Sequence, residues 1–166
     1  SRSPKVKLYL NDKLIGEKET GKENYTATFD VPYEPGTLKA VNSKGKEEFV
    51  LKTAGAPAAI RLIADRSKIK ACKNDLSYVK IELVDKNGNV VPETSLPVKI
   101  ECTGKGTVIA GGNAAYADME SFRSLTPNTF RGKAIAIVQP DGEKGDIQVK
   151  VSAKGLEDAS IVITTY

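Results

Sequence analysis

Apolar and polar residues alternate along most of this chain, and this period of two restricts its fold more than any other feature. In Lys5–Leu10, the apolar Val6, Leu8 and Leu10 occupy every second position. The same alternation recurs over 78–85, 147–153 and 159–163. Successive side chains of a β-strand point to opposite faces, whereas an amphipathic helix repeats its apolar positions every three or four residues. The pattern therefore predicts half-buried antiparallel strands and favours an all-β fold.

Turn-forming residues separate the predicted strands at intervals of roughly 8–12 residues, which is typical of a β-sandwich. Glu34-Pro35-Gly36, Asn87-Gly88 and Asp141-Gly142 are examples. One segment departs from the alternation, because Lys133–Val138 is apolar on both faces after its lysine. Such a run predicts a central strand that is covered on each side.

The alternation is interrupted at Ala54-Gly55-Ala56-Pro57-Ala58, where small residues and a proline predict a domain boundary. We therefore expect two tandem immunoglobulin-like or fibronectin-type β-sandwich domains, residues 1–54 and 55–166. The second has seven or eight candidate strands, as an immunoglobulin-like sandwich requires. The first has five, namely Lys5–Leu10, Leu14–Glu19, Tyr25–Val31, Thr37–Asn42 and Glu47–Thr53. A sheet that small is marginal alone, so we expect the first domain to be small or truncated on its N-terminal side.

Composition excludes several classes of function. The 166 residues are too few for a hydrolase barrel of ~250 residues. The chain has no His and no Trp, which removes imidazole bases, His metal ligands and Ser-His-Asp triads. The 25 basic and 21 acidic residues are spread along the chain rather than clustered, which does not favour nucleic-acid binding. No apolar run approaches the roughly 18 residues of a membrane span. We predict no catalytic residue, no metal ligand and no cofactor in this chain.

The start of the chain, Ser1-Arg2-Ser3-Pro4, has neither an initiating Met nor the apolar core of a signal peptide. We therefore expect a piece of a longer protein.

The two cysteines of this chain differ in their expected orientation. Cys102 keeps the parity of Val98 and Ile100 and should point inward, whereas Cys72 has the outward parity. This favours two separate thiols, with a Cys72–Cys102 bridge as the alternative.

The segment Asp85-Lys86-Asn87-Gly88-Asn89 begins like a calcium-binding loop. Such a loop needs a bidentate Glu at its twelfth position, where this chain has Leu96. A hairpin with Asn87-Gly88 at its tip accounts for the segment better.

Several long strings in this chain are specific enough to compare with a known family. In the first part they are VKLYLNDKLIG (Val6–Gly16) and VPYEPGTLKAV (Val31–Val41). In the second part they are AGAPAAIRLIADRSKIKA (Ala54–Ala71), SYVKIELVDKNGNVVP (Ser77–Pro92) and FRGKAIAIVQ (Phe130–Gln139). In order and over nearly the whole chain, these strings resemble the C-terminal accessory modules of bacterial glycoside hydrolase family 2 β-galactosidases, whose first module usually has "VELFLNGKSLG" at the first string and a strand-turn-strand at the second. This resemblance implies a parent enzyme, exported to the periplasm or cell surface of a bacterium, whose two catalytic Glu residues lie upstream of Ser1.

The resemblance implies that this chain is a non-catalytic tail that supports or spaces the catalytic domain of the same polypeptide and helps to shape its substrate cleft. Two alternatives belong to other classes: a carbohydrate-binding module, and an immunoglobulin-like stalk of a bacterial surface adhesin. The VPYEPGTLKAV string argues against the adhesin.

The candidate binding residues lie in Gly111–Phe122, a long segment without alternation. The resembling family usually has "GNG-D/N-P-x-S-H-E-x-F" here; Asn113, Glu120 and Phe122 match, whereas Met119 replaces His and Tyr116 replaces Pro. Asp118 and Glu120 are two residues apart, so a strand would place both carboxylates on one face. Two interpretations stay open: a loop held by Phe122 and a buried Asn113 amide, or a contact with carbohydrate or the catalytic domain.

Overall fold

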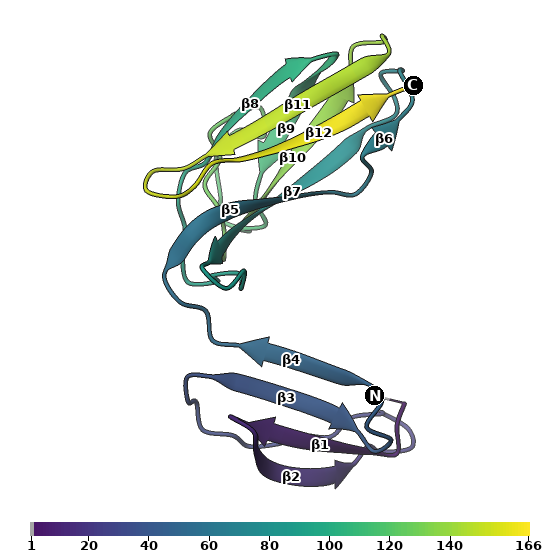
Figure 1. Ribbon diagram of the computed structural model, residues 1–166, viewed down its shortest axis with the longest axis vertical. Helices are drawn as coiled ribbons and strands as arrows, with labels where there is room; N and C mark the ends of the chain where they lie inside the picture. The colour runs from purple at the N-terminus through teal and green to yellow at the C-terminus, as the bar shows by residue number, and fades with distance from the viewer. Residues whose placement is uncertain (1) are drawn as a thin grey trace. The chain divides into compact units, whose positions relative to one another are not determined.

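A computed structural model describes residues Arg2–Tyr166, which form two compact units, Ser1–Thr53 and Ala54–Tyr166 (Figure 1). Every regular element among the described residues is a β-strand, so the predicted all-β fold class is confirmed. The two units are described separately below.

The first unit contains one antiparallel sheet of four strands in the order β2-β1-β3-β4. These strands are β1 (Lys5–Leu10), β2 (Lys13–Glu19), β3 (Thr37–Asn42) and β4 (Glu48–Lys52). The hairpin between β1 and β2 turns at Asn11 and Asp12, whose φ angles of 50° and 63° suit a tight two-residue turn. Asn tolerates this left-handed conformation better than most residues, which explains why a glycine is not needed here.

The segment between β2 and β3 is irregular, so the prediction of a strand at Tyr25–Val31 is wrong. Its Phe29 ring lies against Gly16 of β2, within 3.6 Å of where a Cβ would be. Lys18 holds the segment from the sheet side: its Nζ donates to the carbonyl of Thr28 at 2.6 Å and lies 5.3 Å from the centre of the Phe29 ring. The contacts of Lys18 and Phe29 therefore hold this segment in place of backbone hydrogen bonds to a neighbouring strand. Apolar alternation makes a strand possible but does not ensure that another strand pairs with it.

Thr53 fastens the end of the first unit. Its backbone N–H donates to the carbonyl of Gly36 at 2.8 Å, and its hydroxyl accepts from the N–H of Gly36 at 3.0 Å. This pair of bonds ties the residue after β4 to the turn before β3.

The second unit is a sandwich of two four-stranded sheets, with strand orders β5-β7-β10-β9 and β6-β12-β11-β8. The strands are β5 (Pro57–Ala64), β6 (Lys68–Ile69), β7 (Ser77–Asp85), β8 (Lys99–Gly104), β9 (Gly106–Gly112), β10 (Lys133–Pro140), β11 (Gly145–Ser152) and β12 (Ala159–Thr165). Adjacent strands pair antiparallel except β6 with β12. In immunoglobulin terms the first sheet has the order A-B-E-D and the second contains C, F and G, so the predicted immunoglobulin-like topology is confirmed.

The core of the sandwich lies between the two sheets and is formed by inward residues of both. Val79, Ile81, Val149, Val151 and Ile163 are all fully buried there. Cys102 packs partly buried against this cluster and Cys72 is exposed; both are free thiols, as the alternation predicts. Burial raises the pKa of the Cys102 thiol.

The strand β10 is central, between β7 and β9, but the prediction that it is covered on both faces is wrong for this chain. Ala134, Ala136 and Val138 point into the core, whereas Ile135 points outward and is 38% exposed. The outward apolar residues lie on the solvent side of the sheet.

The buried carboxylate of Asp85 organises the turn after β7. Its Oδ1 accepts from the N–H groups of Asn87 and Asn89, each at 2.9 Å. Its Oδ2 accepts from the N–H of Gly55 at 2.8 Å and from the side-chain amide of Asn89. These bonds, led by that from Gly55, lower the pKa of Asp85 to about 2. Since the carboxylate is occupied by four N–H donors, the segment is a turn, as predicted, and Asp85 serves as its cap.

Candidate functional site

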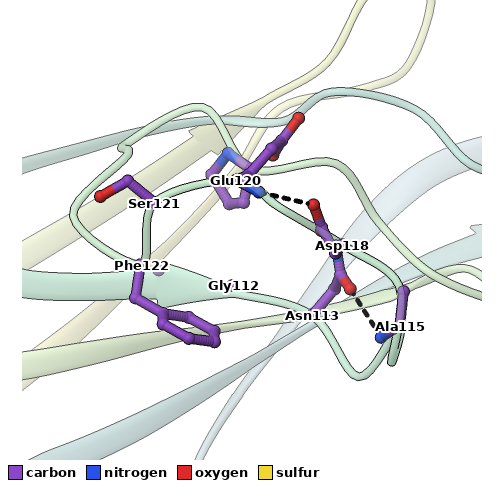
Figure 2. A pocket seen from close by; sticks show the side chains of 9 residues that line it. Gly112, Asn113, Ala115, Asp118, Glu120, Ser121 and Phe122 are labelled. Atoms are coloured by element: carbon purple, nitrogen blue, oxygen red, sulfur yellow. Dashed lines mark hydrogen bonds between the residues drawn. The ribbon is translucent and has the colours of Figure 1, made fainter.

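The candidate site is the loop that follows β9 and returns to the same strand (Figure 2). The N–H of Gly111 donates to the carbonyl of Phe122 at 2.7 Å, which closes the loop at its base. Gly111 has little room for a side chain, because a Cβ would lie 2.9 Å from the carbonyl oxygen of Ser124. The small residues at the end of β9 thus allow the returning chain to pack closely.

Asn113 holds the first half of the loop with both ends of its amide. Its Oδ1 accepts from the N–H of Ala115 at 2.7 Å, and its Nδ2 donates to Asp118 at 2.5 Å and to the carbonyl of Asn128 at 3.0 Å. The second oxygen of Asp118 accepts from the N–H of Glu120 at 2.9 Å (Figure 2). Two short side chains therefore close successive turns of the backbone.

Glu120 holds the second half of the loop. Its carboxylate accepts from the backbone N–H of Asn128 at 3.2 Å and from the side-chain amide of the same residue. Asp118 and Glu120 lie in an irregular segment rather than a strand, and they bond to different asparagines. Neither carboxylate is free of an internal partner, so the arrangement favours a fixed loop over a pair of acid-base groups.

The large apolar side chains of the loop are directed outward. Tyr116 and Met119 are 99% and 95% exposed, and Phe122 is 69% exposed. Phe122 lies over Gly112, where a Cβ would come within 2.7 Å of its ring. Phe122 thus packs on Gly112 while its ring stays largely exposed, and the Asn113 amide is hydrogen-bonded within the loop. Hydrogen bonds, not apolar burial, hold this segment.

The hollow among these residues encloses about 20 Å³ and is lined by Asn113, Asp118, Glu120, Phe122 and Pro127, with small residues between them. That volume is about enough for one or two water molecules. A sugar ring cannot enter it, so any ligand of this loop would be contacted by its outer surface. Binding of carbohydrate or of the catalytic domain by Asn113, Asp118, Glu120 and Phe122 stays a prediction.

Sequence reasoning missed Asn128, which accepts from Asn113 and donates to Glu120. No local pattern marks it, because it follows the loop in sequence and becomes its neighbour only when the segment before β10 folds back.

Among residues 2–166, no group of three or more Cys, Asp or Glu side chains is arranged to hold a metal ion. In the same range, no helix has the length and apolar character needed to cross a membrane.

The fold is thus an all-β one, an immunoglobulin-like sandwich that a small β-sheet unit precedes in the sequence. Comparison with known proteins identifies the family. Residues 60–162 match the model for "Glycoside hydrolase family 2 C-terminal domain 5", and residues 1–49 match "Domain of unknown function (DUF4982)". The chain belongs to the glycoside hydrolase family 2 C-terminal domain 5 family.

Individual relatives agree with this assignment. A beta-galactosidase from Bacteroides ovatus is 32% identical over 99% of this chain, and a beta-glucuronidase from Formosa agariphila is 27% identical over 98%. The chain spans 20% and 17% of their lengths, respectively. The crystal structure of a glycosyl hydrolase family 2 member from Bacteroides cellulosilyticus superposes with a TM-score of 0.88 and 37% identity, over 98% of this chain and 23% of that one.

Proposed function

We propose that this chain is a non-catalytic accessory region of a family 2 glycoside hydrolase, and that it supports and spaces the catalytic domain of the same polypeptide. The observation that carries this proposal is the connection between the units. Thr53 is hydrogen-bonded within the first unit and Gly55 is hydrogen-bonded to Asp85 within the second. Ala54 alone separates the two anchored residues. So short a connection suits a spacer better than a flexible tether.

The loop supports the same reading. A glycosidase needs two carboxyl groups ~5–9.5 Å apart on either side of a bound sugar. Asp118 and Glu120 accept hydrogen bonds from their own loop and its neighbour Asn128, beside a hollow of about 20 Å³. The catalytic carboxylates of the proposed parent therefore belong to another part of its chain. The outward Tyr116, Met119 and Phe122 would be available to line the rim of a cleft formed elsewhere.

The parent activity is proposed from the relatives. The Bacteroides ovatus relative is a beta-galactosidase and the Formosa agariphila relative a beta-glucuronidase, so a β-glycosidase acting on a pyranoside is the class that both support. Export to the periplasm or cell surface is proposed on the sequence resemblance, and fractionation of cells that produce the parent protein would test it.

Removal of this chain from the parent enzyme tests the supporting role. We expect a lower melting temperature and a lower kcat/KM, because a docked module stabilises the surface that it covers. The matched control is the parent with Val162→Ser, an exposed change on β12 that should alter neither quantity. Unchanged stability, oligomeric state and kinetics after removal would contradict the proposal.

The isolated chain separates this reading from carbohydrate binding. We expect no hydrolysis of aryl β-galactosides and no retardation in affinity gels that contain galactan or arabinogalactan. Retardation that is lost on Tyr116→Ala and Phe122→Ala would instead identify the loop as a carbohydrate-binding surface.

A further inference from the structure

The two outer faces of the sandwich differ in chemistry. On the β6-β12-β11-β8 sheet, the outward residues are mostly polar, including Lys99, Glu101, Gln148 and Lys150, and Val162 is the exposed aliphatic residue. On the β5-β7-β10-β9 sheet, the outward residues are arranged in cross-strand rows that are mainly apolar. The second face is therefore the unusual one, because a solvated sheet face normally carries polar side chains.

The central row of that face crosses all four strands. Ile63 is opposite Lys80, Lys80 is opposite Ile135, and Ile135 is opposite Gly112. Gly112 has no side chain, and the ring of Phe122 occupies the space above it. The loop thus completes a row that the strand itself leaves empty, with exposures of 40% for Ile63, 38% for Ile135 and 69% for Phe122.

A second apolar row adjoins the first, because Ile137 lies opposite both Tyr78 and Ala110. We call the two rows together the Ile135 face; it consists of Ile63, Tyr78, Lys80, Ala110, Ile135, Ile137 and Phe122. Tyr78 is 41% exposed and contributes both apolar area and a polar tip. Contiguous exposed apolar surface of this kind marks interaction sites on soluble domains.

A charged row borders the Ile135 face. Arg61 and Lys133 lie on either side of Glu82, and Lys80 reaches Glu82 from the next row. Glu82 is buried and bonded by the guanidinium of Arg61 at 2.6 Å and by Lys80 at 3.2 Å. Burial opposes ionisation of Glu82, but the bonds from Arg61 and Lys80 outweigh it and lower the pKa of Glu82. Three cations against one carboxylate leave this border positively charged.

We propose that the Ile135 face is the surface by which this chain docks on the remainder of the parent glycoside hydrolase, against a protein surface that is apolar at its centre and acidic opposite Arg61 and Lys133. This rests on the proposed function. The charge argues against a second copy packed face to face, since like charges would meet. A free sugar is also disfavoured as the occupant, because Lys80 and Glu82 are paired with each other and do not offer their polar groups to a ligand. The curated relatives extend far beyond this chain, which spans 20% of one of them, so a partner surface within the same polypeptide is available.

Cysteine labelling tests the assignment in the intact parent. Ile135→Cys and, as the matched control, Val162→Cys are introduced separately in a Cys72→Ser background, and maleimide labelling of each peptide is followed by mass spectrometry. Both positions are outward and partly exposed in the chain alone. We expect Ile135→Cys to react at least about tenfold more slowly in the parent than in the 166-residue chain, and Val162→Cys to react at similar rates in both.

The outcomes distinguish the docking surface from the supporting role. Equal labelling of Ile135→Cys in the parent and the isolated chain overturns the docking surface, even where removal of the chain lowers the stability of the parent. Protection of Ile135→Cys that appears in the isolated chain as its concentration is raised identifies a second copy as the occupant and also overturns the proposal. If Ile135→Cys is protected while removal of the chain changes nothing in the parent, the docking surface stands and the supporting role fails.

Discussion

The two units have similar numbers of strands per sheet but very different interiors. Leu8 and Leu10, each 8% exposed, are the buried apolar side chains among the described residues of the first unit. The second unit has a continuous cluster between two sheets, in which Ile81, Leu83, Val138 and Ile147 are completely inaccessible. A single sheet covered by an irregular segment buries one face incompletely, whereas two facing sheets bury each other. Apolar burial is the main stabilising contribution to folding, so the second unit should provide most of the stability.

Separation of the units is the most severe test of this difference. We expect residues 54–166 to unfold cooperatively, with a melting temperature close to that of the second unit in the whole chain. Residues 1–53 should show no cooperative transition, because a core of two leucines does not offset the conformational entropy of ordering the segment. Circular dichroism and calorimetry on the two fragments would measure this. A sharp calorimetric peak from residues 1–53 would contradict it.

Truncation of one core residue in each unit gives the next largest contrast. Ile81→Ala should lower the free energy of unfolding of the second unit by roughly 2–5 kcal/mol, since it opens a cavity in a fully buried site. Leu10→Ala should leave the main unfolding transition of the chain unchanged, because Leu10 belongs to the first unit. Urea unfolding followed by circular dichroism measures both. Equal effects of the two substitutions would mean that the units unfold as one.

Alternation predicted most strands of both units, because each strand has one buried face and one solvated face. It failed at Tyr25–Val31, where the segment has a strand-like pattern but does not pair with a strand, and contacts of Lys18 and Phe29 hold it instead. It also could not tell whether the second apolar face of β10 is covered. Periodicity reports which side chains avoid water, and it does not report which protein surface covers them.

In the candidate loop, too, contacts between residues close in sequence could be predicted, whereas contacts between residues far apart in sequence could not. The pairing of Asn113 with Ala115 is a short-range turn that sequence can suggest. The bonds of Asn128 to Asn113 and Glu120 join parts of the chain that meet only after the segment before β10 folds back. The packing of Phe122 depends on Gly112 and the strand beneath it, so the residue type alone could not predict how exposed the ring would be.

The effect of pH tests the polar anchor of the second unit. The folded pKa of Asp85, about 2, lies below its ordinary value of 3.8. Its ionised form therefore stabilises the fold fully above pH 3.8, and this contribution is lost as the pH falls toward 2. Asp85→Asn should lower the melting temperature at neutral pH, and the gap from the unmodified chain should close in acid. Asp30→Asn, an exposed change in the first unit, is the control and should run parallel to the unmodified chain. A gap that persists at pH 2 would show that the geometry of the side chain, and not its charge, is what matters.

The smallest expected effect concerns an apolar residue that the first unit leaves in solvent. Phe49 on β4 is 68% exposed, so Phe49→Ser removes little buried area and should change the free energy of unfolding by no more than about 0.5 kcal/mol. Phe29→Ser is the matched comparison, because the Phe29 ring covers Gly16 and holds the irregular segment. Its loss should weaken or remove the protection of the β2 amides against hydrogen exchange. Hydrogen exchange read by mass spectrometry resolves both in the whole chain. If Phe49→Ser were the more disruptive of the two, Phe49 would have to be buried in solution, and the first unit would then have a larger interior than its own residues provide.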